Sequence, residues 1–199
     1  MAEAVSGDTD GIPNTRNRRQ EETFSKVLRA GIELLRETSY TELTVRAVAA
    51  RAKVAPATAY TYFSSKNHLI AEVYLDLVRQ VPYFTDVNEP ALDRVNRTLR
   101  NLALVVADEP EVAAACTVAL LSGSSDPTVR AVRDRIGAQI HRRIASAFGP
   151  GTDPRTISAV EMAFFGALVN AGSGAFTYPQ IIDRLAYVVG LIMESGAPQ

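Results

Sequence analysis

Residues Thr44–Lys66 read TVRAVAARAKVAPATAYTYFSSK, and this stretch decides the fold of the first third of the chain. Thr44 can cap a short helix over residues 44–52, because its hydroxyl can accept from a free N–H of the first turn. Pro56 suits the first position of a second helix and disfavours a helical Ala55, so a break falls just before it. A helix of about nine residues, a turn of about three and a second short helix make a helix-turn-helix, whose second helix enters the major groove of DNA.

The rest of the chain also shows helical periodicity. Apolar residues recur at helical spacing from Phe24 to Leu35, which predicts an amphipathic helix over residues 18–38. Proline- and glycine-containing breaks separate the remaining predicted helices, which cover residues 56–62, 66–83, 91–107, 111–121, 127–147, 154–176 and 179–194. No useful strand alternation occurs, so we predict an all-α chain of about nine helices. Residues 1–17 are predicted to be a disordered N-terminal tail, because polar residues dominate there without an apolar period.

Composition excludes several classes of protein. The one cysteine, Cys116, allows no intrachain disulfide, and no Cys/His cluster exists, so we expect neither a metal site nor a cofactor. No run of about 18 apolar residues occurs and the N-terminus does not look like a signal peptide. We therefore expect a cytoplasmic, nucleoid-associated protein. No acid/base pair or nucleophile constellation stands out, so we predict no enzyme activity.

Charge is distributed unevenly along the chain. The net charge is −1, but residues 16–66 hold ten bases and five acids, whereas the segments before and after them are acidic on balance. A basic module on a mildly acidic body favours a polyanion partner for the first third of the chain. A solvated charged surface is the alternative interpretation.

The first third resembles the DNA-binding domain of the TetR family of transcriptional regulators (TetR/AcrR type). The matching residues are Tyr40, Thr44, Val45, Val48, Ala49, Ala52, Val54, Thr58, Tyr60, Tyr62, Phe63, Ser65, Lys66 and Leu69. The resemblance implies a DNA-binding domain over residues 18–66 and a ligand-binding and dimerisation domain over residues 67–199, with the helix over 66–83 connecting the two. Two positions depart from the family pattern, because Ser39 and Lys53 stand where the family usually has glycine. A left-handed backbone at either would cost about 1 kcal/mol.

The resemblance assigns DNA contacts to the helix-turn-helix and the start of the next helix. These residues are Thr44, Arg46, Lys53, Pro56, Ala57, Thr58, Tyr60, Thr61, Tyr62 and Lys66. We expect Arg46 at a guanine, or alternatively at a phosphate or idle on the surface. Tyr62 and Lys66 are expected at phosphates; the alternatives are packing against the first helix for Tyr62 and an idle surface lysine for Lys66. Arg16, Arg18 and Arg19 would form an arm to the DNA or a solvated tail.

The resemblance also places a ligand pocket and a dimer surface in residues 67–199. Pocket candidates, for each of which plain core packing is the alternative, are Asn101, Leu104, Val105, Val112, Cys116, Thr117, Leu120, Phe148, Phe164, Phe165 and Leu168. Their types favour an apolar or amphipathic ligand. Dimer-surface candidates on the last two helices are Gly166, Asn170, Gly174, Ile181, Leu185, Val188, Val189 and Ile192. The small residues at 166–174, Gly172 included, suggest a close approach of helices, as in a four-helix bundle shared by two chains. For Gly172–Gly174 the alternative is a helix end or kink.

Together these features predict a bacterial, sequence-specific transcriptional repressor. It would bind an inverted-repeat operator in double-stranded DNA as a homodimer, and a hydrophobic or amphipathic small molecule would release it. An activator, or a regulator that needs its ligand to bind DNA, would have the same sequence features. More remote alternatives are a helical scaffold for other proteins and an all-α enzyme.

Overall fold

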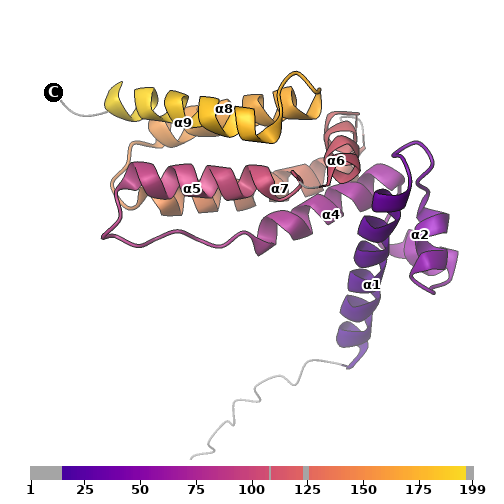
Figure 1. Ribbon diagram of the computed structural model, residues 1–199. Helices are drawn as coiled ribbons and strands as arrows, with labels where there is room; N and C mark the ends of the chain where they lie inside the picture. The colour runs from indigo at the N-terminus through magenta and orange to yellow at the C-terminus, as the bar shows by residue number, and fades with distance from the viewer. Residues whose placement is uncertain (1–14, 108, 123–125, 196–199) are drawn as a thin grey trace, which may run out of the picture.

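The computed structural model describes residues 15–107, 109–122 and 126–195, and in these ranges the chain forms nine helices and no strand (Figure 1). They are α1 (Thr15–Glu37), α2 (Val45–Arg51), α3 (Pro56–Tyr62), α4 (Lys66–Gln80), α5 (Ala91–Leu104), α6 (Pro110–Ser122), α7 (Pro127–Phe148), α8 (Pro154–Gly172) and α9 (Tyr178–Ser195). The all-α prediction is therefore confirmed for this part of the chain. None of these helices is both long enough and apolar enough to cross a membrane.

Four helix ends differ from the prediction by three residues or more, and two of them have a local cause. One of the four is the end of α5, which lies at Leu104 and not at residue 107. Helix α4 ends at Gln80 and not at residue 83, because Pro82 disfavours a helical Val81, whose ψ is 125°. Helix α8 ends at Gly172 and not at residue 176, because Gly174 adopts φ 76° and closes the helix. The N–H groups of Gly174 and Ala175 donate to the carbonyls of Ala171 and Asn170, both at 3.0 Å, which is a Schellman motif.

Helix α1 begins at Thr15, three residues before the predicted start. Residues 15–17 are therefore helical and do not belong to the disordered tail predicted over residues 1–17. The rest of that tail lies outside the described residues. Arg18 and Arg19 are exposed side chains on the first turns of α1 and not on an arm before it.

The helices form a head and a body joined by α4. Helices α1–α3 make up the head at one end of the molecule, and α5, α7, α8 and α9 lie together in the body (Figure 1). Helix α4 packs against α1 on the head side and against α6 and α7 on the body side, while α6 also touches α1. Any movement of α4 or α6 relative to the body therefore has a direct route to the head.

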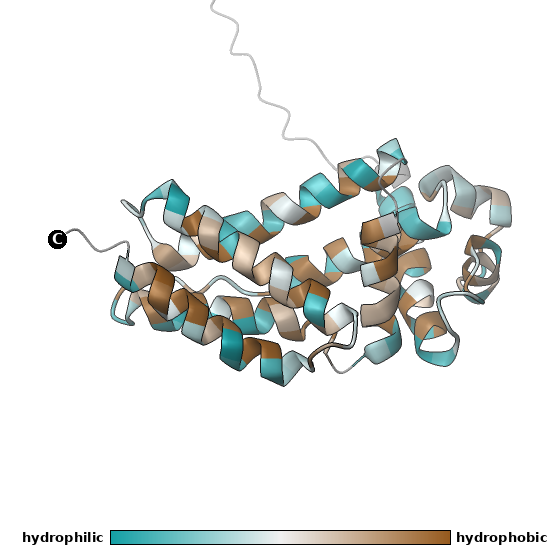
Figure 2. Ribbon diagram, turned by 90° about the horizontal axis from the view of Figure 1, so that it is seen from above, coloured by the Kyte–Doolittle hydropathy of each residue, from teal (hydrophilic) through white to brown (hydrophobic). Residues whose placement is uncertain are grey.

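One apolar core runs through most of the molecule. It extends from Val27 and Phe63 in the head, through Leu69 and Leu75 of α4, to Val189 of α9. A small separate cluster of Val45, Ala49 and Ala59 joins α2 to α3. Figure 2 shows hydrophobic and hydrophilic residues alternating along the helices, as expected for amphipathic helices that bury one face.

Two buried arginines hold the ends of helices in the body. Arg94 donates to the carbonyls of Asp86, Glu89, Ala147 and Phe148, and so joins the loop before α5 to the end of α7. Arg143 of α7 donates to the carbonyls of Arg79 and Val81 at 2.8 Å each and thereby satisfies the free carbonyls at the end of α4.

Candidate nucleic-acid interface and ligand cavity

Two local features begin the two helices of the helix-turn-helix in the head. The Thr44 hydroxyl accepts from the N–H of Ala47 at 3.0 Å and caps α2. Pro56 occupies the first turn of α3, and Ala55 before it is extended, with ψ 139° and no side-chain cap. Helix α3 is therefore the less well capped of the two, because alanine has no side-chain acceptor for the free N–H groups of the first turn.

Lys53 is the one residue other than glycine that has a positive φ in the described part of the chain. Its φ is 56°, and the N–H groups of Lys53 and Val54 donate to the carbonyls of Ala50 and Ala49 at 3.1 and 3.0 Å. This is a Schellman turn with lysine at the position that usually holds glycine. Of the two positions where the family usually has glycine, only Lys53 has the left-handed backbone; Ser39 has no positive φ and instead hydrogen-bonds the carboxylate of Glu42.

Eight of the ten predicted DNA-binding residues are exposed around this turn and along α3. They are Thr44, Arg46, Lys53, Pro56, Ala57, Thr58, Tyr60 and Thr61. Arg46 and Lys53 have no ion pair with a described residue, whereas nearby Arg51 is paired with Glu37 and Glu33 of α1. These eight predicted residues therefore lie on one exposed, positively charged surface of the head.

Tyr62 and Lys66 are half-buried and lie behind this surface. The ring of Tyr62 meets Phe24 of α1 edge to face at 6.1 Å, which is the packing alternative for this residue. Phe63 beside it is fully buried and stacks on Phe24 at 5.1 Å, so it is a core residue and not part of the exposed surface.

Lys66 clamps the loop between α1 and α2. Its Nζ donates to the carbonyl of Tyr40 at 2.8 Å and reaches the carbonyl of Thr41 at 3.5 Å, and it lies 4.1 Å from the centre of the Tyr40 ring. These carbonyls and the ring offset the unfavourable position of a cation in the first turn of a helix. An ammonium has three N–H donors, so one is left for a phosphate oxygen. Lys66 is thus not an idle surface lysine.

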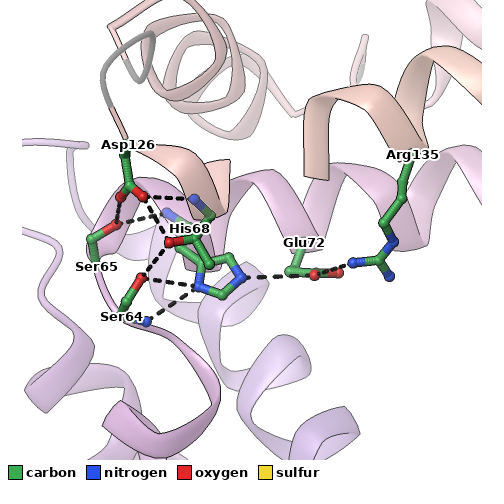
Figure 3. A network of polar contacts seen from close by, with 7 residues as sticks. Ser64, Ser65, His68, Glu72, Asp126 and Arg135 are labelled. Carbon is green, nitrogen blue, oxygen red and sulfur yellow. Dashed lines mark hydrogen bonds and ion pairs between the residues drawn. The ribbon is translucent and has the colours of Figure 1, made fainter. Parts of the chain in front are cut away.

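A polar network joins the start of α4 to the start of α7 (Figure 3). Asp126 caps α7 by accepting from the N–H of Thr128 at 2.9 Å, and it also accepts from the Ser65 hydroxyl at 3.3 Å. Ser64 donates its N–H to Nδ1 of His68 at 3.2 Å, so this nitrogen carries no proton and the other ring nitrogen faces Glu72. The network therefore fixes the junction between head and body.

Glu72 ends this network on the body side. It is buried, and Arg135 of α7 donates to its carboxylate at 2.6 Å. Burial alone would raise the pKa of Glu72, but the hydrogen bond from Arg135 and the nearby His68 ring, whose Nε2 lies 3.8 Å from the carboxylate, outweigh it and hold the pKa below its ordinary value. Sequence reasoning missed these residues, because their partners are far apart along the chain.

A cavity of about 350 Å³ lies between α4, α6, α7 and α8. Its lining is mainly apolar and comprises Tyr74, Val106, Ala113, Cys116, Thr117, Leu120, Leu121, Arg133, Asp134, Ile136, Gly137, Phe165, Leu168, Val169 and Tyr178. Burial raises the pKa of the Cys116 thiol to about 12, and it also raises the pKa values of Tyr74 and Tyr178. The thiol and both phenols therefore stay protonated at neutral pH.

Five of the eleven predicted pocket residues line this cavity and six do not. Cys116, Thr117, Leu120, Phe165 and Leu168 are in the lining, whereas Asn101, Leu104, Val105, Val112, Phe148 and Phe164 are not. Phe164 and Val112 are buried core residues, and the neighbours Phe165 and Ala113 face the cavity instead. Phe148 lies eleven residues beyond the last cavity residue of α7, which is about 16 Å along a helix.

The remaining three misplaced residues are on or just after α5. The Asn101 amide donates to the carbonyl of Arg97 at 2.9 Å, and Leu104 and Val105 are partly buried away from the cavity. Val106 reaches the cavity in their place. Sequence reasoning missed the lining residues Tyr74, Arg133 and Tyr178, because apolar periodicity does not pick out polar side chains. Gly137 is the one lining residue whose type is unusual inside a helix.

The proposed dimer surface is only partly exposed. Ile181, Leu185 and Val189 are buried in the core of their own chain, so their assignment to a dimer surface is wrong. They are the face of α9 that packs on α5 and α8. Gly166, Asn170, Gly174 and Val188 are exposed and Ile192 is partly buried.

Exposed apolar residues extend the accessible part of this surface over α8 and α9. They are Met162, Phe165, Val169, Tyr187, Val188 and Leu191, of which Met162 and Tyr187 are 74% and 70% exposed. Gly172 is not part of it, because a Cβ there would lie 2.7 Å from Cγ2 of Thr117 in α6. The close approach expected of that glycine thus occurs within one chain.

Comparison with known proteins agrees with this architecture. Residues 27–73 match the family described as bacterial regulatory proteins, tetR family. An HTH-type transcriptional regulator of Mycobacterium tuberculosis is 72% identical over 195 residues, which cover 98% of this chain and 87% of that protein. The HTH-type transcriptional repressor KstR of Rhodococcus jostii is 28% identical over 99% of this chain and 93% of its own length.

Solved structures share the fold. A TetR transcriptional regulator from Rhodococcus sp. RHA1 superposes with a TM-score of 0.73 at 22% identity, covering 90% of this chain and 98% of that one. The TetR-family repressor FadR of Thermus thermophilus, solved in complex with lauroyl-CoA, gives 0.65 at 15% identity and covers 88% and 96%.

Proposed function

The chain belongs to the TetR family of bacterial regulatory proteins, which are transcriptional regulators and not enzymes, and from that premise we propose that it is a ligand-released repressor. The head would bind an inverted-repeat operator, and two chains would pair to present two heads. A hydrophobic or amphipathic ligand in the cavity would lower the affinity for that operator. The observation that carries this proposal is that one helix, α4, both lines the cavity through Tyr74 and joins the head to the body.

The exposed surface of the head supports specific roles for its residues. Arg46, exposed on the first turn of α2, would read a guanine, while Lys53 and Lys66 would contact phosphates. The small groups of Pro56 and Ala57 at the start of α3 would meet thymine methyls. Replacing Arg46 with alanine should then change sequence preference, whereas replacing Lys53 should weaken binding to all sequences alike.

Exposed apolar residues of α8 and α9 support pairing through this face. Met162, Tyr187 and Leu191 would be covered by the second copy, together with Gly166 and Val188. A large exposed apolar patch of this kind is typical of a protein–protein interface. Phe165 and Val169 belong both to this face and to the lining of the cavity, so pairing would also partly close the cavity mouth.

The repressor proposal is tested in two steps. Sheared genomic DNA captured by the purified protein at about 0.15 M salt and sequenced should yield an enriched inverted repeat, which identifies the operator. Fluorescence anisotropy on a labelled operator then measures affinity with and without lauroyl-CoA, the ligand of the FadR neighbour. We expect the ligand to weaken binding by about 5- to 150-fold, the range of a coupling of about 1–3 kcal/mol.

Three other outcomes have distinct meanings. Tighter DNA binding in the presence of ligand would make the protein a co-repressor-dependent regulator or an activator. Ligand binding measured by calorimetry without any change in operator affinity would refute release by ligand. A genome selection without an enriched repeat, both with and without ligand, would refute the role as a sequence-specific reader.

A further inference from the structure

The cavity between α4, α6, α7 and α8 contains polar groups that the protein itself leaves without partners. Tyr74 is only 5% exposed and lines the cavity, yet no described residue hydrogen-bonds its hydroxyl. The Tyr178 hydroxyl also lacks a partner among the described residues. Neither oxygen is among the fully buried, unpaired polar atoms of the described residues, so both hydroxyls are open to the cavity and can donate to a polar atom of a bound molecule.

Arg133 of α7 is a second unmatched group in the same lining. It is half-buried, and no acidic side chain of the described residues lies within ion-pair distance of its guanidinium. Asp134, its neighbour in the chain, is exposed at the rim and does not pair with it. The other arginines that are at least half-buried in the body, Arg94 and Arg143, are fully engaged with carbonyls. An unpaired cation beside an apolar lining favours an anion.

The lining places these polar groups at different depths. Tyr74, Cys116 and Ile136 are buried, whereas Asp134, Phe165 and Val169 are exposed and mark the mouth. Arg133 is next to Asp134 and so lies near this mouth. Leu120 and Leu168, both partly buried, supply the apolar wall between the two ends.

We propose that this cavity binds an elongated amphipathic anion, with its carboxylate or phosphate on Arg133 and its apolar body between Leu120 and Leu168. An oxygen at the deep end of the ligand would accept a hydrogen bond from Tyr74. The inference rests on the proposed function and deepens it, because it selects anionic amphiphiles over neutral lipids and hydrophobic drugs. The guanidinium can pair with either anion through two parallel hydrogen bonds.

Isothermal titration calorimetry with matched twelve-carbon probes tests the anion. Dodecanoate and dodecyl phosphate distinguish the two anions, and methyl dodecanoate and dodecanol are their neutral counterparts. We expect at least one anion to bind the wild-type protein about tenfold more tightly than both neutral probes, which corresponds to about 1.4 kcal/mol. Arg133→Gln should remove this preference and leave dodecanol binding unchanged. Arg142→Gln, an exposed position on the same helix outside the cavity, is the control and should change nothing.

The deep end is tested with 12-hydroxydodecanoate. Tyr74→Phe removes only the hydroxyl, so it should weaken binding of this probe about five- to tenfold and leave dodecanoate binding unchanged. Equal losses for both probes would show that the phenol acts through packing and would overturn its assigned role.

The outcomes separate this inference from the proposed function. Equal binding of the anionic and neutral probes by the wild-type protein would overturn the anion assignment without requiring any variant, and a ligand-released repressor would remain possible. If no probe binds and neither the probes nor lauroyl-CoA change operator affinity, the proposed function fails as well. Retention of the anion preference in a folded Arg133→Gln variant would overturn the assignment to Arg133.

Discussion

Replacing Lys53 with glycine should stabilise the fold and weaken DNA binding at the same time. Lys53 is exposed and has φ 56°, a conformation that costs a residue with a Cβ about 1–2 kcal/mol and costs glycine nothing. Glycine loses more conformational entropy on folding, by about 0.5–1 kcal/mol. Both hydrogen bonds of the turn come from backbone N–H groups at residues 53 and 54, and a substitution of the side chain keeps them.

The balance of these terms is a stabilisation of about 0.5–1 kcal/mol by Lys53→Gly. For a chain of this length, that corresponds to a rise in Tm of roughly 1–4 °C. Differential scanning calorimetry at one fixed protein concentration measures it, because the Tm of a protein that self-associates depends on concentration. A Tm equal to or below that of the wild type would refute the assignment of backbone strain to Lys53.

DNA binding separates the role of the charge from that of the backbone. If Lys53 contacts a phosphate, Lys53→Gly should lower operator affinity and reduce the slope of log K against log salt by about one per head. Lys53→Ala is the matched control, since it removes the charge and keeps the Cβ. It should match the glycine variant in DNA binding and show no gain in Tm. An unchanged salt slope in both variants would remove Lys53 from the DNA interface.

Three further predictions test the body of the protein. The pKa of Glu72 is lowered in the folded state, so its carboxylate stabilises the fold above the unfolded pKa of about 4.3, and this stabilisation is lost as the pH falls further. Glu72→Gln should therefore lower the Tm at pH 7. The difference in Tm between the variant and the wild type should shrink below about pH 4. Gly172→Ala should destabilise by about 1–3 kcal/mol in urea unfolding, because the new methyl group meets the Thr117 side chain, and adding Thr117→Ala should restore most of the loss. Tyr187→Glu should give a monomer in light scattering. Val87→Glu is the control and should leave the dimer intact, because Val87 is an apolar residue that is 85% exposed and lies outside α8 and α9. A dimeric Tyr187→Glu variant would argue against the proposed face.

The sequence was sufficient for the order and nearly all the bounds of the helices, because these depend on local chemistry. Pro56 and Pro154 mark helix starts, and Thr44 and Asp126 are caps whose side chains accept from nearby N–H groups. The resemblance marked both Ser39 and Lys53 as positions where a left-handed backbone would be strained, but it did not decide which of them has one; only Lys53 does among the described residues. The ends that differed did so by a few residues, as is usual for helix termini.

The lining of the cavity was less predictable, because it depends on how each helix is rotated about its axis. A shift of one position along α6 or α8 exchanges Val112 for Ala113, or Phe164 for Phe165, and all four residues are apolar. The dimer surface was hard to predict in a similar way: Ile181 was assigned to it but is buried within its own chain. An apolar stripe indicates that a helix face is covered, but not whether its own chain or a second copy covers it.

Helix α4 explains how one ligand could affect a head that it does not touch. Tyr74 on the cavity wall is eight residues from Lys66, which holds the loop between α1 and α2, and that separation is about 12 Å along a rigid helix. Between them, His68 and Glu72 tie α4 to Ser64 and to Arg135 of α7. A ligand that moves α4 at Tyr74 must therefore either strain this network or carry Lys66 and the head with it. In both cases the ligand and the operator would favour different positions of the same helix, so each would weaken binding of the other by the same factor.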